Sequence, residues 1–191
     1  MKSTYHYQRI PRSRIATFDV YSVAMQKHHI SAMLEFDVTD SRQKLRDYRR
    51  KASKASFNAW LIKVISMAVE QHPEAASYRI SKKRLITFDN INVSILVEKE
   101  INGKKVPIPL VIENTHEKSI TDITLEIEEA KNQPLKTSDI VLNQRPGKAE
   151  RLYYLLPGFL RRSVWKFMLR HPKIAYEKMG NVVITSLSMM G

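Results

Sequence analysis

Six histidines are the residues of this chain best suited to acid–base or metal chemistry, because imidazole titrates near neutral pH and ligates transition metals. No two of them stand three or four residues apart, the spacing that places two ligands on one face of a helix. His28 and His29 are adjacent and precede a predicted strand, where successive side chains point to opposite faces. His72 and His171 each precede a proline and are expected at helix C-termini, where positive charge is favourable. The sequence therefore predicts no metal site.

Familiar catalytic motifs are missing as well. The chain has no glycine-rich phosphate loop, no His-Glu-x-x-His and no Gly-x-Ser-x-Gly. It contains no cysteine, which excludes disulfides, thiolate metal sites and a cysteine nucleophile. No run approaches the ~18 apolar residues of a membrane-spanning helix, and the polar N-terminus does not resemble a signal peptide. We therefore expect a cytoplasmic protein.

The charge is strongly positive, at +13 with 32 basic and 19 acidic residues. The excess lies in residues 1–63 and 144–191, whereas residues 64–143 are close to neutral. Such a chain attracts polyanions, whether nucleic acid, anionic lipid or a phosphorylated cofactor. The simpler interpretation of the basic stretch 42–54 is the solvated face of one helix. Residues 145–178 interleave basic and aromatic side chains; they could lie on an anionic membrane or, more commonly, wrap an apolar neighbour in their own protein.

Apolar spacing predicts the elements that must position any functional group. Alternation over Ile30–Val38 predicts a half-buried strand, and Asp40 or Ser41 can cap a basic helix over Arg42–Lys51. Ser56 can cap a longer amphipathic helix. The expected apolar face of that helix consists of Phe57, Trp60, Leu61, Val64, Ile65, Ala68 and Val69.

A β-hairpin is predicted next. Apolar runs over 91–97 and 106–112 flank Asn102-Gly103, a favoured hairpin turn. Pro107 and Pro109 predict that the second run is an edge strand or an irregular one, because proline has no amide hydrogen to donate to a neighbouring strand.

Further helices and a last strand complete the pattern. Ser119 and Asp122 resemble a capping box for a helix over Ile120–Lys131. Residues 144–179 predict two short helices broken at Pro157-Gly158, and Asn181–Leu187 is a β-branched run typical of a buried strand. The order of elements predicts a mixed α/β layer fold.

Several segments, taken together, carry a resemblance. They are Pro11–Ile15, Phe36–Thr39, Ser56–Val64, Ile91–Ile95, Val106–Asn114 and Lys118–Ile123. In this order they resemble the catalytic domain of dihydrolipoamide acyltransferases, the core subunits of 2-oxo acid dehydrogenase complexes. The likeness covers roughly residues 10–191. Its most specific part is an apolar strand ending in Val-Ile-x-Asn, a polar link and a Lys-Ser-Ile helix start.

This resemblance implies a chloramphenicol-acetyltransferase-like α/β fold (α+β, two-layer), with a mixed sheet flanked by helices. It implies a single acyltransferase-like domain over residues 1–191, in which the basic, aromatic helices of 145–178 are an insertion. It also implies a homotrimer with each active site in a channel between two subunits. Coenzyme A would enter from one side, and a lipoyl arm or another acyl acceptor from the other.

The implied reaction is acyl transfer between a thiol and a thioester. It needs a general base for the thiol and a donor for the oxyanion of the tetrahedral intermediate. In the family the base is the histidine of a His-x-x-x-Asp-Gly motif, and the donor is a hydroxyl on a late strand. Gly180–Ser188 resembles that strand, so Thr185 and Ser186 are the candidate oxyanion donors. Arg14 matches an arginine near the family's cofactor channel and is a candidate for the phosphates of coenzyme A.

Two departures from the family are clear. The His-x-x-x-Asp-Gly motif is absent, so we expect either a chain incomplete at its C-terminus or a shortened homologue without catalysis. There is no lipoyl domain or Pro/Ala-rich linker before residue 10, which is typical of a stand-alone acyltransferase.

Three functions therefore compete. The first is a coenzyme-A-dependent acyltransferase whose base is not in this chain. The second is a non-catalytic family member that binds a partner or an oligomer. The third is a basic domain that binds nucleic acid or an anionic membrane through residues 42–54 and 145–178, for which no reader motif is present. For the strand over Gly180–Ser188, the alternative interpretation is a core strand whose hydroxyl groups are incidental.

Overall fold

The computed structural model of the protein describes residues 5–8, 13–26, 28–51, 54–101, 104–133 and 148–186. The chain forms two compact units. The sheet unit consists of Ala32–Val141 and Leu169–Gly191. The helical unit consists of Met1–Ser31 and Leu142–Met168.

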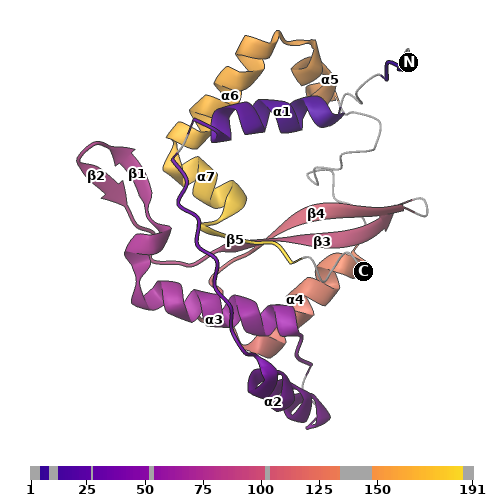
Figure 1. Ribbon diagram of the computed structural model, residues 1–191, viewed down its shortest axis with the longest axis vertical. Helices are drawn as coiled ribbons and strands as arrows, with labels where there is room; N and C mark the ends of the chain where they lie inside the picture. The colour runs from indigo at the N-terminus through magenta and orange to yellow at the C-terminus, as the bar shows by residue number, and fades with distance from the viewer. Residues whose placement is uncertain are drawn as a thin grey trace, which may run out of the picture. The chain divides into compact units, whose positions relative to one another are not determined.

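A three-stranded mixed sheet lies at the centre of the sheet unit, with the strand order β4-β3-β5 (Figure 1). β3 (Val93–Ile101) and β4 (Lys104–Ile112) pair antiparallel along their whole length. β5 (Val182–Ile184) pairs parallel with the first residues of β3. The sheet thus joins a local hairpin to a strand from a distant part of the chain.

The hairpin confirms the prediction from sequence. Ile101 is opposite Lys104, while the predicted turn residues Asn102 and Gly103 lie outside the described residues. Pro107 and Pro109 lie in β4, at the edge of the sheet. An edge strand tolerates proline because its outer side needs no amide donor.

Two helices, α3 (Phe57–Gln71) and α4 (Ile120–Asn132), lie along one side of this sheet (Figure 1). Both begin at the predicted caps. The Ala59 amide donates to the Ser56 hydroxyl at 3.1 Å, and Ser119 and Asp122 form the reciprocal capping box. Helices and sheet share one apolar core. Its buried members are Ala59, Ile62, Ile91, Val93, Ile95, Val97, Ile112, Ile123 and Ile127.

The buried face of α3 differs from the predicted one. Ala59, Ile62 and Ser66 are buried, whereas Val64, expected on the apolar face, is exposed. This helix is apolar on nearly every side, so spacing alone does not select a face. Ser66 tolerates burial because its hydroxyl donates to the Ile62 carbonyl at 2.7 Å and lies 2.6 Å from the Thr115 hydroxyl.

The other elements of the sheet unit are α2 (Thr39–Arg50), the 3-10 turn η1 (Pro73–Ala76), β1 (Tyr78–Ser81), β2 (Arg84–Ile86) and α7 (Pro172–Met179). β1 and β2 form a separate antiparallel hairpin, which the sequence analysis did not predict. Three aromatic rings join this part to α7. Phe88 stacks on Tyr176 with 3.9 Å between ring centroids and meets the ring of Tyr78 edge-on at 5.8 Å.

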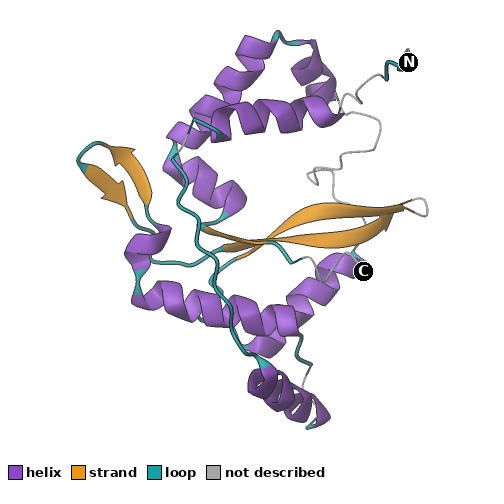
Figure 2. Cartoon of the chain, in the orientation of Figure 1, coloured by secondary structure: helices purple, strands orange, loops and turns teal. Residues whose placement is uncertain are grey.

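The predicted strand over Ile30–Val38 is wrong. This segment has no regular structure and is drawn as loop up to α2 (Figure 2). Ile30 and Met33 are 100% exposed. A strand requires a neighbour for its backbone groups, and no strand of the described residues pairs with this segment.

The basic helix predicted after this segment is confirmed as α2. It begins at Thr39, three residues earlier than expected, and its first amide bonds to the carboxylate of Asp37 at 2.9 Å. Its arginines at 46, 49 and 50 are exposed, while Leu45 is buried. The arginines of the basic stretch thus lie on the solvated face of one helix, as the simpler interpretation held, whereas Lys54 lies beyond that helix and its ammonium contacts a Glu128 carboxylate oxygen at 2.7 Å.

The helical unit contains α1 (Ser13–Ala24), α5 (Lys148–Leu155) and α6 (Gly158–Arg170). The break at Pro157-Gly158 is confirmed, because α5 ends before it and α6 begins at the glycine, but the described part of residues 144–179 forms a third helix, α7, where two were predicted. Residues 145–147 of the expected insertion lie outside the described residues.

The architecture is an α/β fold with a mixed sheet flanked by helices, as the sequence predicts. That residues 1–191 act as one domain stays a prediction. Among the described helices none is both long and apolar enough to cross a membrane.

Candidate functional site

Thr185 and Ser186 directly follow the last residue of β5. This strand is shorter than predicted, since it covers residues 182–184 of the expected 181–187, and Leu187 lies outside the described residues. Ile184 pairs with Ile95 of β3, so the two hydroxyl residues continue alongside the middle of that strand. The sheet therefore sets where the candidate donors stand.

A glycine fixes the corner at which the chain enters β5. Gly180 has a φ of 66°, in the left-handed region that side chains disfavour. A Cβ atom on this residue would lie 2.2 Å from the carbonyl oxygen of Asn92. Only glycine therefore fits here.

Hydrogen bonds then hold this corner to the start of β3. The Asn92 carbonyl accepts from the amides of Asn181 at 3.0 Å and Val182 at 3.3 Å. In return, the Asn92 amide donates to the side-chain oxygen of Asn181 at 2.9 Å. The Tyr78 hydroxyl donates to the Gly180 carbonyl, and burial, with a smaller effect of Tyr176, raises the pKa of Tyr78. The position of the strand is thus fixed by polar contacts as well as by pairing.

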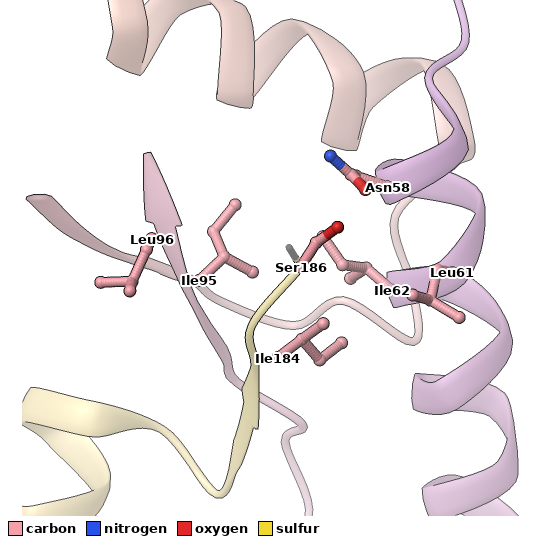
Figure 3. Close-up of a pocket in the computed structure, with 7 residues that line it drawn as sticks. All are labelled: Asn58, Leu61, Ile62, Ile95, Leu96, Ile184 and Ser186. Atoms are coloured by element: carbon pink, nitrogen blue, oxygen red, sulfur yellow. The ribbon is translucent and has the colours of Figure 1, made fainter. Parts of the chain in front are cut away.

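Beyond β5, Ser186 lies in a small open pocket between α3 and the sheet, whose free volume of about 20 Å³ is room for one or two water molecules. The described residues that line this pocket are Asn58, Leu61, Ile62, Ile95, Leu96, Ile184 and Ser186 (Figure 3). Five of these side chains are aliphatic, two are polar, and none is charged. The lining is therefore mostly apolar, with two polar side chains and no charge among the described residues.

The two polar side chains meet at one end of the pocket. Figure 3 shows the hydroxyl of Ser186 pointing towards the side-chain amide of Asn58. Thr185 is exposed and is not among the lining residues. The structure thus separates the two hydroxyl groups that sequence left equivalent.

Asn58 was not among the residues singled out from sequence. It stands in the first turn of α3, between Phe57 and Ala59. The available signal was a side-chain amide within an otherwise apolar helical turn. This signal indicates a site only once the position of β5 opposite that turn is known. That placement depends on long-range pairing.

The other predicted groups lie elsewhere. Arg14 is the second residue of α1, and its side chain lies outside the described residues. Of the described pocket residues, none is a histidine. His116, 11% exposed, has a buried Nδ1 without a hydrogen-bond partner among the described residues, and its Nε2 lies 3.9 Å from a Glu117 carboxylate oxygen. Within the described ranges no histidine, aspartate and glutamate side chains cluster as a metal site would require.

Solved structures with a similar fold include cores of 2-oxoacid and pyruvate dehydrogenase multienzyme complexes. A truncated catalytic core of the 2-oxoacid dehydrogenase multienzyme complex from Thermoplasma acidophilum has a TM-score of 0.53 at 19% identity, over 72% of this chain and 64% of its own. The cubic core of the pyruvate dehydrogenase multienzyme complex gives 0.56 at 16%, over 97% and 65%.

A third structure is the dihydrolipoamide acetyltransferase of Azotobacter vinelandii, with a TM-score of 0.52 at 16% identity, over 66% of this chain and 55% of its own. The roles of a serine, a histidine and an asparagine in its catalytic mechanism have been investigated. The chain thus spans less than two thirds of the length of each of these structures. At these identities the likeness shows the fold.

The sequence itself shows the family. No curated protein matches the chain at a significant level. Residues 6–140 match the family described as 2-oxoacid dehydrogenases acyltransferase (catalytic domain), and this range is more than half of the chain. The resemblance noted in the sequence is therefore confirmed: the chain belongs to the 2-oxoacid dehydrogenase acyltransferase catalytic-domain family.

Proposed function

We propose that the protein transfers an acyl group between coenzyme A and a thiol or other acceptor, in the manner of a dihydrolipoamide acyltransferase. Its family membership supports this reaction class. The observation that carries the proposal is the Ser186 hydroxyl in an apolar pocket, at the end of a strand that resembles the family's oxyanion strand.

Ser186 has the chemistry that the reaction needs. When a thiolate adds to a thioester, negative charge develops on the carbonyl oxygen, and a hydroxyl donor held beside that oxygen stabilises the charge. Thr185 is the second candidate, although its exposed position favours Ser186. A serine is also among the residues investigated in the mechanism of the Azotobacter vinelandii enzyme.

These 191 residues do not contain the general base of the family, which is the histidine of a His-x-x-x-Asp-Gly motif. No histidine is followed four residues later by aspartate, and none of the described pocket residues is a histidine. We propose that the acceptor thiol reacts as the thiolate that is already present in solution. Its rate should then follow the thiolate fraction of the acceptor, which rises about tenfold per pH unit below the pKa of the acceptor thiol.

The proposal includes partners and organisation. Coenzyme A is the acyl-carrying substrate, with Arg14 paired to one of its phosphates. A lipoyl-carrying protein is the candidate acceptor, and a homotrimer the candidate assembly, which the multienzyme cores among the structural neighbours support. Residues 145–178 are an insertion in a single domain over 1–191, in keeping with a family match that ends at residue 140. We place the reaction in the cytoplasm, as suits a chain without cysteine.

The test is acyl transfer from acetyl-coenzyme A to dihydrolipoamide, followed by product formation between pH 6.5 and 8.5. We expect a slow rate that rises with pH without a plateau near pH 7. Ser186→Ala should lower kcat about 100-fold, the usual effect of losing an oxyanion donor. Thr185→Val tests the second candidate in the same assay.

Ser163→Ala is the matched control, because Ser163 is exposed in α6 and bonds only to the carbonyl of its own helix among the contacts described. It should leave the rate unchanged. Transfer no faster than the uncatalysed reaction would overturn the proposal in favour of a non-catalytic family member. An unchanged rate in Ser186→Ala, together with a large loss in Thr185→Val, would move the donor role to Thr185.

A further inference from the structure

A row of apolar side chains is exposed on the two helices α5 and α6. Leu152 and Leu155 of α5 are 62% and 80% exposed, and Phe159, Leu160 and Val164 of α6 are exposed as well. Single exposed apolar side chains are ordinary in a folded protein. A succession of them along two consecutive helices is typical of a surface that binds something apolar.

Helical spacing shows which side of α6 faces outwards. Arg161 and Trp165 stand four residues apart, so they share one side of the helix. Arg161 Nε bonds to the Asp19 carboxylate of α1 at 2.7 Å, and the Trp165 indole donates to a tyrosine of α5 at 2.9 Å, which makes this the inner side. Leu160 and Val164 precede these two residues by one position each, and therefore lie on a neighbouring, exposed side.

The other neighbouring side of α6 is positively charged. Arg162 and Lys166 follow the inner pair by one position each, and both are exposed. The segment itself supplies no carboxylate, because every charged residue from 151 to 176 is basic. A basic side beside an apolar side is the pattern of a helix that lies in the interface of a lipid bilayer. The outer surface of the two helices consists of Leu152, Leu155, Phe159, Leu160, Arg162, Val164 and Lys166.

Charge distinguishes between the partners that this outer surface can have. A second copy of the chain would bring the same cations face to face in a symmetric contact, which is unfavourable. Nucleic acid would pair with the cations but would leave the leucine side chains in water, since its bases stack on aromatic and guanidinium groups. An anionic bilayer suits both sides, because its headgroups attract cations and its acyl chains accept leucine and phenylalanine.

We propose that the outer surface binds a membrane rich in anionic lipid, with the leucines and Phe159 at the acyl boundary and Arg162 and Lys166 among the headgroups. The contact is peripheral, since among the described helices none could cross a bilayer. The inference goes beyond the proposed acyl transfer, because the outer surface contains no residue of the Ser186 pocket. Membrane binding by this surface does not depend on catalysis.

The test is sedimentation of the full chain with vesicles of phosphatidylcholine that contain about 30% phosphatidylserine, compared with vesicles of phosphatidylcholine alone. Binding to the mixed vesicles should be at least about tenfold tighter, because their negative surface potential attracts the cations. It should weaken between about 0.1 M and about 0.5 M salt without disappearing, since salt screens the charges but does not remove the gain from apolar burial.

One pair of double variants separates the outer surface from the charge of the whole protein. Arg162→Gln/Lys166→Gln should weaken binding to the mixed vesicles about 20-fold, because two cations leave the headgroup region. Lys44→Gln/Arg49→Gln is the matched control, which removes the same charge from exposed positions of α2. It should weaken binding less than about twofold.

A second pair of variants tests the apolar contact. Leu155→Ser should weaken binding to the mixed vesicles about tenfold, the effect of burying one leucine less. Leu85→Ser is the control, because Leu85 is 62% exposed on β2 and lies in the sheet unit. It should bind as the wild type does. The substituted side chains are all exposed, so every variant should keep the wild-type melting temperature.

Three outcomes would overturn the proposal. An equal loss in the two double variants would assign the binding to net charge. Tighter binding of the wild type to polyuridylate than to the mixed vesicles, with Leu155→Ser unchanged towards both, would indicate a nucleic-acid surface. A wild type that does not bind the mixed vesicles would refute the membrane contact, and a change of oligomeric state in Leu155→Ser would then assign the outer surface to a contact between copies.

Discussion

The two units of this protein are stabilised by different means. The sheet unit contains a contiguous aliphatic core formed by α3, α4 and the sheet. In the helical unit the buried described residues are one valine, Val23, and one carboxylate, Asp19. Several of its large apolar side chains are exposed, among them Phe18, Tyr21, Leu152, Leu155, Phe159 and Phe167.

A polar network takes the place of a core in the helical unit. Asp19 of α1 accepts from the Tyr153 hydroxyl of α5 at 2.9 Å and from Arg161 Nε of α6 at 2.7 Å. Trp165 adds a bond to the same hydroxyl at 2.9 Å. The carboxylate raises the pKa of Arg161, chiefly through their hydrogen bond. The basic, aromatic segment thus contacts α1 of its own protein through polar groups, and not by wrapping an apolar neighbour, since its apolar side chains at 152, 155, 159 and 167 stay exposed.

The comparison shows what each kind of contact contributes to the folded protein. Aliphatic burial is non-directional, so the sheet unit tolerates variation in its side chains provided that volume is kept. A buried carboxylate is directional and costly when unpaired, so it specifies how three helices meet but leaves little reserve of stability. Three substitutions test this contrast, in order of decreasing effect.

The largest effect is expected from Ile123→Ala in α4. Ile123 is fully buried in the aliphatic core, so its truncation leaves a cavity and should lower the free energy of unfolding by about 2–5 kcal/mol. Urea denaturation measures this change. Leu125→Ala, two residues along the same helix but exposed, should cost under about 1 kcal/mol. Equal losses in the two variants would contradict the assignment of the core.

Local signals in the sequence were sufficient for most elements of the sheet unit. The caps at Ser56 and Ser119 and the antiparallel pairing of β3 with β4 depend on neighbours within a short stretch of chain, and all three predictions are confirmed. The strand prediction for Ile30–Val38 was wrong because alternating apolar residues indicate the two faces of a strand but do not show that a second strand is present to pair with it. α3 was predicted correctly as a helix, but its buried face was not, because a helix apolar all round shows no preferred side.

The candidate site depends far less on local signals. Thr185 and Ser186 came from a family resemblance, and only the placement of β5 beside β3 separates them. Asn58 could not be found from sequence, since nothing near α3 indicates that a strand more than a hundred residues later faces its first turn. Long-range pairing of this kind is what a single sequence leaves undetermined.

The second prediction concerns the polar network. Arg161→Met removes one donor and leaves the buried Asp19 carboxylate with an unpaired charge, which should cost about 2–3 kcal/mol. Hydrogen exchange should show the loss as faster opening of α1, α5 and α6. Adding Asp19→Leu to the same chain should recover most of the loss, because no buried charge then remains.

Lys166→Met is the matched control, since this basic residue of α6 is exposed. It should leave exchange in the helical unit unchanged. If Arg161→Met behaves in the same way, the network is a surface feature and does not hold the helices together. If the double variant is less stable than Arg161→Met alone, the carboxylate contributes through contacts other than the ion pair.

The smallest effect is expected from Tyr78→Phe, which removes a polar contact inside the unit that has an aliphatic core. The variant loses the hydrogen bond to the Gly180 carbonyl at the entrance to β5, so unfolding at pH 7 should become easier by about 1 kcal/mol or less. A smaller loss here than in Arg161→Met would agree with the contrast between the units, since the core still holds β5.

The pKa of Tyr78 sets the direction in which the stability of the protein should change with pH. Burial raises the pKa of Tyr78 in the folded protein above its ordinary value of about 10, so the folded state holds this proton more tightly than the unfolded chain. The contribution to stability is complete below pH 10 and is lost as the pH rises from there through the raised folded value. Urea denaturation at pH 7 and pH 11 should therefore show a smaller alkaline loss in Tyr78→Phe than in the wild type. Tyr7→Phe, at an exposed tyrosine, should keep the wild-type loss; if both variants keep it, the hydroxyl of Tyr78 does not stabilise the corner that positions Ser186.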